Sequence, residues 1–275
     1  MKYLFTFIFM LIFFFSCKEK KSYLVEYKFS YASDSLNKEN KNVENMLLHI
    51  TDSGFVFLPK ASFIIDTAKA IDLSKIITPG KRISFNDLNI SNVKLPENNL
   101  KLFYKKDSNR YYVRSSADRL NYSFTDDVPE IKWNLLDDVK QINNYKAKKA
   151  TTNLFGRNWE AWYTEEIKQN YGPYKFNGLP GLILELRDTD DNFGFEFVDL
   201  KIDTTKYTSL YKDFVKTNST KNDFINKSID YKKNPGLFHK NVGKDTVKAN
   251  LILKDKLEKL KKKNNSIEKG FQFNL

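Results

Sequence analysis

The chain has 275 residues, with 46 basic and 34 acidic side chains and a formal net charge of +12 at pH 7. Its single cysteine excludes an intramolecular disulfide. Most of the basic residues are lysines spread over every segment, whereas nucleic-acid recognition favours arginines clustered with aromatic side chains. We therefore expect no nucleic-acid partner and interpret most of the charge as solvated surface.

The chain begins with an apolar run over residues 4–15, which is followed by Ser16, Cys17 and a charged stretch. This run is shorter than the about 20 residues that span a bilayer and has the length of a secretory signal core. We predict a signal peptide over residues 1–16 and a lipidated tether over residues 17–22, with Cys17 as the lipid acceptor. The two phenylalanines before Ser16 depart from the lipoprotein pattern, so cleavage without lipidation and an uncleaved anchor are the alternatives.

Strands are predicted where apolar and polar residues alternate, because a period of 2 places one face of a strand on a core. The first strand shows this most clearly, with an apolar face formed by Tyr23, Val25, Tyr27, Phe29 and Tyr31. Further strands are predicted over residues 46–51, 55–59, 101–105, 110–115, 120–125, 145–153, 159–164, 182–187 and 193–202. Many short strands separated by polar turns favour an antiparallel sheet.

The clearest hairpin joins residues 182–187 to residues 193–197 through a polar turn. We expect its three phenylalanines, at positions 193, 195 and 197, to share a face in the core. Acidic and amide residues here also have the spacing of calcium-loop ligands, namely Asp188, Asp190, Asn192, Glu196 and Asp199. The required glycine and flanking helices are missing. The sequence therefore predicts a hairpin turn and no metal.

The remaining segments have weaker patterns. Residues 61–99 are predicted as loops with short helical turns, and residues 206–275 as a lysine-rich extension of a β domain over residues 23–205. Within this extension we predict a helix over residues 247–263 that packs on the sheet, because three leucines recur at helical spacing, namely Leu253, Leu257 and Leu260.

Proline and glycine predict a sharply specified corner before the hairpin. Residues 179–182 suit a type II turn, with Pro180 fixing φ and Gly181 supplying a positive φ. Gly178 is expected to allow close backbone approach, and Gly172-Pro173 forms a second bend. The corner is therefore expected to be structural.

This corner contains the sequence Gly-Leu-Pro-Gly-Leu-Ile at residues 178–183, and on it the chain resembles the GLPGLI family of Bacteroidetes. The similarity extends over roughly residues 133–200. The family-motif residues are Gly172, Pro173, Gly178, Leu179, Pro180, Gly181, Leu182 and Ile183. The family has no established activity, so the resemblance implies an envelope location and a fold rather than a reaction. We expect a mainly β (α+β) fold, a curved antiparallel sheet or half-barrel with one or two helices in its concavity.

The residue types that usually carry chemistry are sparse. His49 and His239 lie in unrelated segments, and both are predicted to be at the surface, so neither metal nor cofactor is expected. No nucleophile or phosphate-loop motif occurs, and we assign no catalytic residue. Two facing carboxylates leave no local signature, so a carboxylate-dependent envelope hydrolase acting on glycans or peptides stays an alternative.

A dense aromatic cluster precedes the corner and allows two interpretations, core packing or a binding face. Its members are Trp159, Trp162, Tyr163, Tyr171, Tyr174 and Phe176. Strand alternation puts Trp159 and Tyr163 on one face and Trp162 on the other. A large aromatic side chain outside the core would suit a peptide, sugar or acyl partner.

These observations predict a non-catalytic binding protein of the cell envelope, an outer-membrane lipoprotein that is periplasmic or surface-facing. Its membrane contact is the lipid on Cys17, and its partner is a small apolar or peptide ligand or an outer-membrane transporter. The alternatives are the hydrolase and a structural envelope protein whose basic surface bridges membrane and cell wall.

Overall fold

The computed structural model describes residues 21–75, 93–97, 99–117, 120–203, 215–233 and 265–269, together with Lys254 and Leu257. These residues form a large antiparallel sheet with two helices. The first six strands are β1 (Ser22–Tyr31), β2 (Asn42–Thr51), β3 (Gly54–Pro59), β4 (Lys101–Lys105), β5 (Arg110–Ala117) and β6 (Leu120–Asp127). The others are β7 (Asn134–Ile142), β8 (Tyr145–Leu154), β9 (Arg157–Thr164), β10 (Leu182–Asp188) and β11 (Phe193–Asp203). The helices are α1 (Lys60–Lys75) and α3 (Lys221–Lys233).

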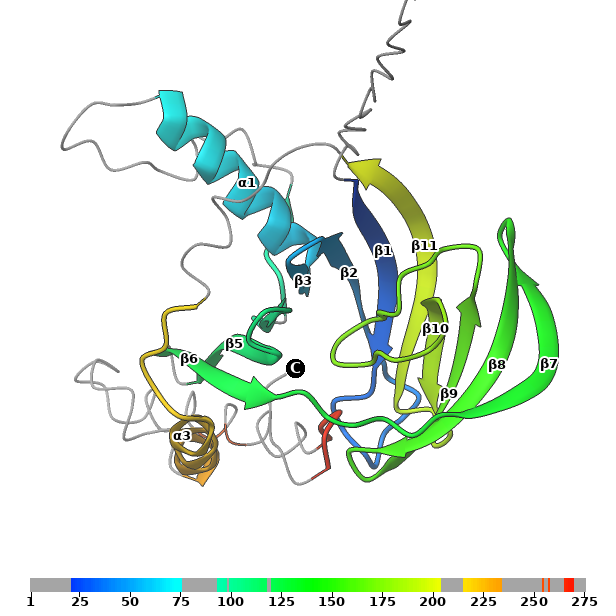
Figure 1. Ribbon diagram of the computed structural model, residues 1–275. Coiled ribbons are helices and arrows are strands. Elements are labelled where there is room, and N and C mark those ends of the chain that lie inside the picture. Colours follow the sequence, from blue (N-terminus) through cyan, green and yellow to red (C-terminus); the bar gives the residue numbers. More distant parts are fainter. Residues whose placement is uncertain are drawn as a thin grey trace, which may run out of the picture.

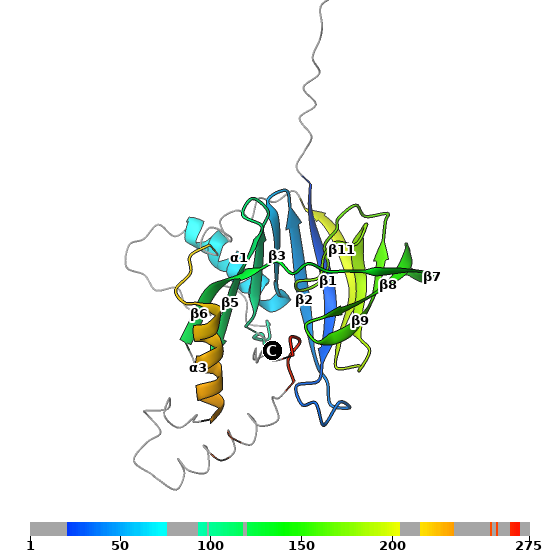
Figure 2. The same cartoon turned by 60° about the horizontal axis from the view of Figure 1, so that its bottom comes forward.

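The sheet consists of two meanders that meet in the middle. Its strand order is β6-β5-β4-β3-β2-β1-β11-β10-β9-β8-β7, and β1 pairs with β11 along its whole length. The sheet is strongly curved and open, and the link at residues 128–133 runs across its open side from β6 to β7 (Figures 1 and 2). The predicted mainly β fold with a curved antiparallel sheet is thus confirmed.

The concave face of the sheet carries the main core. The alternating side chains of β1 are buried there as predicted, from Val25 to Tyr31. Phe193 and Phe195 of β11 stack beside Phe29, with ring centroids 6.4 and 4.3 Å from it, and Phe197 packs at the edge of the same core. The loop between β9 and β10 turns into this concavity (Figure 1). The core is therefore completed by a loop as well as by strands.

The helices differ from the expectation. Helix α1 packs on the convex face, where Phe63 joins Leu47, Val56 and other side chains of β2 to β4. Helix α3 lies on the core side, with the Phe224 ring 5.5 Å from that of Phe124. A convex-face helix was not predicted, because residues 61–99 show no regular apolar period.

Helix α3 and strand β7 were also not predicted. The predicted helix over residues 247–263 lies outside the described residues, apart from Lys254 and Leu257, which are helical. The predicted signal peptide and Cys17 lie outside them as well. No helix in the part of the chain that the structure describes is long and apolar enough to cross a membrane.

Candidate functional site

The motif loop, residues 165–181 between β9 and β10, fills the concavity of the sheet. Phe176 is fully buried and packs edge-on against Trp159, with ring centroids 4.7 Å apart. Two hydrogen bonds tie the loop to distant parts of the chain. The Trp133 indole donates to the Asn177 carbonyl at 2.8 Å, and the Tyr111 hydroxyl donates to the Lys175 carbonyl at 3.2 Å. The loop is thus part of the core and occupies the place where a half-barrel would hold a ligand.

The two glycines of the corner have exchanged the roles that the sequence predicted. Gly178 has a positive φ of 91°, and a Cβ there would lie 3.9 Å from its nearest neighbour. Gly181 does not have a positive φ, so the predicted type II turn is wrong at this position. A Cβ on Gly181 would instead lie 1.9 Å from the Thr164 carbonyl oxygen. Gly181 is required because the end of β9 passes against it.

The first bend of the loop is fixed by side-chain packing. A Cβ on Gly172 would lie 2.7 Å from the Ile183 side chain, so only glycine fits without movement. Two residues later, Tyr174 has a φ of 57°, which is uncommon for a residue with a side chain. Surrounding contacts hold it in this conformation, since its ring is buried and its hydroxyl is bound.

A buried charge network lies under the motif loop. The Lys175 side chain is only 2% exposed, and its Nζ donates to Glu268 at 2.5 Å and to Asp126 at 2.7 Å. Lys221 Nζ donates to both Asp126 carboxylate oxygens, and the Tyr174 hydroxyl donates to Glu268 at 2.6 Å. Among the described residues, the network thus joins two cations with two carboxylates. Burial also raises the pKa of Tyr174, with Glu268 adding to the effect, so its hydroxyl stays a donor.

The pKa of Asp126 makes this network sensitive to acid. Burial acts to raise that pKa, but the charges and hydrogen bonds of Lys175 and Lys221 outweigh it and hold the pKa below its ordinary value of 3.8. An acid whose pKa is lower in the folded state than in the unfolded state stabilises the fold at pH values above its unfolded-state pKa. This stability is lost as the pH falls through the folded-state pKa.

We therefore expect the free energy of unfolding to fall as the pH drops below about 4. Urea unfolding from about pH 7 to about pH 3 measures this dependence. In an Asp126→Asn variant the fall should be shallower, because the titrating group is gone. Equal slopes in the two proteins would show that Asp126 does not contribute to the acid sensitivity.

Segment 265–269 docks against the same loop and against the start of β9. Arg157 is buried, and its guanidinium donates to the Ser266 carbonyl at 2.6 Å and to the Asn265 side chain at 2.6 Å. The main-chain N–H of Lys269 donates to the Phe155 carbonyl at 2.9 Å. Burial lowers the pKa of Arg157, and Asp188, 3.1 Å away, opposes this shift.

The hairpin turn after β10 is built around the Asp188 carboxylate. It accepts hydrogen bonds from the main-chain N–H groups of Asn192 and Phe193, both at 2.7 Å, and from the Asn192 amide and Arg157. These hydrogen bonds belong to the predicted hairpin turn, which is confirmed. Among the described residues, no three histidine, cysteine or carboxylate side chains are grouped as metal ligands.

The outer face of the sheet carries one partly exposed tryptophan, Trp162 on β9. Lys140 Nζ lies 4.4 Å from the indole centroid, and Lys149 Nζ lies 5.8 Å from it. Lys140 pairs with Glu185, and Lys149 pairs with Glu160 at 2.8 Å. Beside the indole is a hollow of about 300 Å³. Its floor and walls combine an aromatic surface with charges of both signs.

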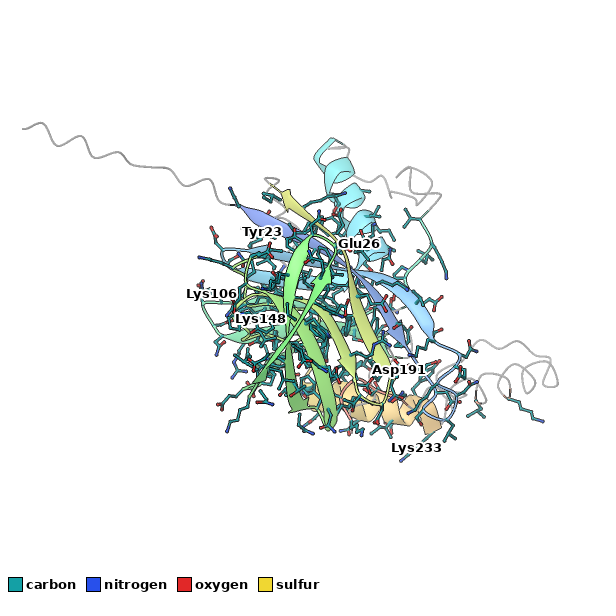
Figure 3. All side chains as sticks on the ribbon, turned by 90° about the vertical axis from the view of Figure 1, so that its right-hand side faces the viewer. Tyr23, Glu26, Lys106, Lys148, Asp191 and Lys233 are labelled. Atoms are coloured by element: carbon teal, nitrogen blue, oxygen red, sulfur yellow. The ribbon has the colours of Figure 1, made fainter. Side chains whose placement is uncertain are left out.

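Exposed ion pairs also lie at the turn of the β10–β11 hairpin and on β8. Asp191 lies in the turn at the end of the β10–β11 hairpin, and Lys148 lies on β8 (Figure 3). Asp191 pairs with Lys41 at 2.7 Å and with Arg187 at 2.5 Å, and Lys148 pairs with Glu165 at 2.9 Å. Exposed pairs of this kind contribute little to stability.

A larger hollow of about 740 Å³ lies between α1, β5, β6 and residues 216–218. Many of its lining groups are paired with one another. Lys101 pairs with Asp66, and the Asn99 amide donates to the Ser116 hydroxyl at 3.0 Å. It contains none of the residues that the sequence singled out.

The predicted binding face is largely core. Trp159, Tyr163, Tyr174 and Phe176 are buried in the main core and cannot contact a partner. Tyr171 is partly exposed, but its ring packs near Phe55 and Tyr104. Trp162 is thus the aromatic residue of this group that faces outward, as strand alternation predicted.

The surface position predicted for His49 is wrong. It is buried at the convex face, where its ring lies 6.3 Å from that of Phe63 on α1. The sequence analysis also missed Arg157, Lys175, Asp126 and Glu268. The signal available for Lys175 was its place between Tyr174 and Phe176, since a lysine flanked by two core aromatics is itself near the core.

Residues 156–185 match the model of a family described as a protein of unknown function (Porph_ging). This stretch contains β9, the motif loop and most of β10. No curated protein matches the chain.

Among solved structures, PNGF-II in space group C2 is similar, with a TM-score of 0.50, 13% identity and coverage of 77% of this chain and 33% of that one. PNGF-II in space group P21 has a TM-score of 0.49 and 14% identity, with coverage of 76% and 34%. This chain spans about a third of the length of that protein. At such identity the likeness shows the fold alone.

Proposed function

We propose that this chain is a non-catalytic binding protein of the bacterial cell envelope, of the GLPGLI type, anchored to the outer membrane by a lipid on Cys17. Its ligand is an extended peptide segment of a partner protein, bound on the outer face around Trp162. The filling of the concavity by the motif loop supports an outer site, because that loop leaves its place only if the core is disrupted.

The observation that carries the proposal is the partly exposed indole of Trp162 between two lysines. Tryptophan is enriched among the residues that dominate binding energy at protein interfaces. Each lysine is next to a carboxylate, Glu185 for Lys140 and Glu160 for Lys149, so a peptide that carries both charges would find partners on both sides of the ring. An aromatic platform with a charged rim favours a polar peptide over an acyl chain.

The neighbouring edge strand supports an extended ligand. Among the described strands β7 pairs only with β8, and its Leu135 and Val139 side chains are 52% and 48% exposed. The opposite edge, β6, is covered by residues 218–219, whose N–H groups donate to the Ser123 carbonyl at 3.0 and 3.2 Å. A peptide added to β7 would gain main-chain hydrogen bonds and lie next to the strand that carries Lys140, three strands from the one that carries Trp162.

The test is to select peptides that bind the mature chain from a displayed library of random peptides, and then to measure the affinities of the selected peptides. Trp162→Ala should weaken binding at least about tenfold, as expected for an aromatic hot spot. Lys148→Ala is the matched control, because Lys148 pairs with Glu165 away from the indole, and it should leave the affinity unchanged. Thermal unfolding shows whether each variant is folded.

Peptides that bind the Trp162→Ala chain as tightly as the parent would remove this face from the proposal. A structural bridging protein would instead show weak association that salt abolishes, with no dependence on Trp162. A hydrolase would use Glu160 and Glu185 beside the hollow. Both already form ion pairs with lysine side chains, Glu185 with Lys140 and Glu160 with Lys149.

A further inference from the structure

Three buried side chains within the family-matched stretch, Arg157, Tyr174 and Lys175, contact segment 265–269, which reads Asn-Ser-Ile-Glu-Lys. Arg157 and the main chain of Phe155 contact one part of it, and Tyr174 and Lys175 contact another. The segment lies on the concave side, away from the outer face that carries Trp162 (Figures 1 and 2, red). Residues of this stretch thus hold a short segment from a distant part of the chain.

Main-chain contacts align this peptide at both ends. The Asn265 N–H donates to the Ser33 carbonyl at 3.1 Å, and the Lys269 N–H donates to the Phe155 carbonyl at 2.9 Å. Between them, Arg157 Nη2 and Nε donate to the Ser266 carbonyl at 2.6 and 3.2 Å. Gly156 fits the groove to the segment, since a Cβ there would lie 3.1 Å from the Lys269 Cβ. These contacts bind the main chain of the segment, which bends at Ile267 and Glu268 and turns at Lys269, and they do not depend on its side chains.

The site makes specific contacts with three side chains of the segment. Ile267 is 1% exposed and belongs to the main core cluster. The Glu268 carboxylate accepts from the Tyr174 hydroxyl and from Lys175 Nζ at 2.6 and 2.5 Å. The Asn265 amide donates to the Ala32 carbonyl and to the Asn192 side chain, both at 2.9 Å. Lys269, in contrast, is exposed. The site therefore selects an apolar residue followed by a carboxylate.

Charge makes the carboxylate necessary. Without Glu268, the Tyr174 hydroxyl would lose the acceptor that it contacts at 2.6 Å, and the Lys175 ammonium, whose side chain is 2% exposed, would lose one of its carboxylates. A buried donor that loses a charged acceptor is destabilised, so this site would favour a peptide that brings an acid.

We propose that Arg157, Tyr174 and Lys175 form a peptide-binding site for a short, bent segment carrying an apolar residue followed by glutamate. Segment 265–269 occupies this site in cis, and the same sequence presented by another polypeptide exchanges with it. A segment on the same chain competes as an intramolecular ligand, whose effective concentration reaches about millimolar order. A peptide in trans therefore binds measurably only when the cis segment is weakened or released.

The test uses the full mature chain and a fluorescent peptide of residues 264–270. The parent chain should bind it weakly, because the cis segment occupies the site. In a Glu268→Gln chain the cis segment is weakened, and the apparent affinity for the Glu peptide should rise at least about tenfold. A peptide with Gln at that position should bind this variant at least about tenfold more weakly than the Glu peptide. Lys269→Ala, the matched control, should behave like the parent.

A second measurement tests the proposal even if the Glu268→Gln chain does not fold. A specific protease site placed between residues 234 and 264 of the parent allows the connection to be cut after folding. The released fragment should stay bound and then exchange with excess labelled peptide. A fragment that never exchanges, or a Glu268→Gln chain that binds no more peptide or does not distinguish Glu from Gln, would overturn the proposal. Neither readout involves Trp162, so these results are independent of the outer-face site.

Discussion

Replacing Gly181 with alanine is expected to lower the free energy of unfolding by about 4 kcal/mol or more, or to prevent folding. The added Cβ would lie 1.9 Å from the Thr164 carbonyl oxygen and 2.6 Å from its carbon, and both atoms belong to the main chain of β9. Main-chain atoms at the end of a strand cannot rotate away as a flexible side chain can. Urea unfolding of the parent and variant gives the difference directly.

Gly178→Ala is the matched comparison within the same motif. The alanine would have to adopt a φ of 91°, but its Cβ would lie no closer than 3.9 Å to any neighbouring atom. The expected loss is on the order of 1 to 3 kcal/mol, from backbone strain alone. A Gly178 variant less stable than the Gly181 variant would contradict the roles assigned to these two residues.

Replacing Lys175 with methionine is expected to lower the free energy of unfolding by about 3 to 5 kcal/mol. The side chain keeps much of its volume, but Glu268 and Asp126 lose a buried cation and are left with Lys221, whose Nζ is 3.9 Å from Glu268. Breaking one side of a buried ion pair is costly because the other charge stays desolvated. Urea unfolding at neutral pH measures the loss.

A double variant separates charge from packing. Lys175→Met with Glu268→Leu removes one positive and one negative charge together, so Asp126 and Lys221 remain as a balanced pair. Replacement of a buried pair by apolar residues is often neutral, so the double variant should be more stable than Lys175→Met alone. An exposed control, Lys148→Met, should show no measurable loss. If the double variant is the least stable of all, the loss comes from packing.

Strands were predictable from the sequence where one face is buried and the other is solvated. The alternation in β1 reports this directly, as do the phenylalanines of β11, of which Phe193 and Phe195 are buried and Phe197 is partly buried. Strand β7 was missed because it is an edge strand with an irregular register between Leu135 and Val139, so its apolar residues do not alternate. Helix α1 was missed because Phe63 and Ile65 are buried but Ile64 is exposed, which is no helical period.

The site was less predictable, because its contacts join residues far apart in sequence. The pattern around the corner predicted that glycine is needed, but not why, since Thr164 approaches Gly181 from another strand. Likewise, the partners of Lys175 are Asp126 on β6 and Glu268 in segment 265–269. His49 was assigned to the surface because alternation identifies the second face of a strand but not the helix that covers it.

The order of the strands also has a consequence for how the chain reaches its fold. Strands β2 to β6 and β7 to β10 each pair with their neighbours in sequence, whereas β1 and β11 pair across most of the chain. Local hairpins form quickly, and closing a loop of this length is slower. The pairing of β1 with β11 is therefore expected to form last during folding. The two meanders resemble separately folded halves. A cut in the link at residues 128–133 would leave each half with one strand of the β1–β11 pair, as in a split protein that reassembles from two fragments.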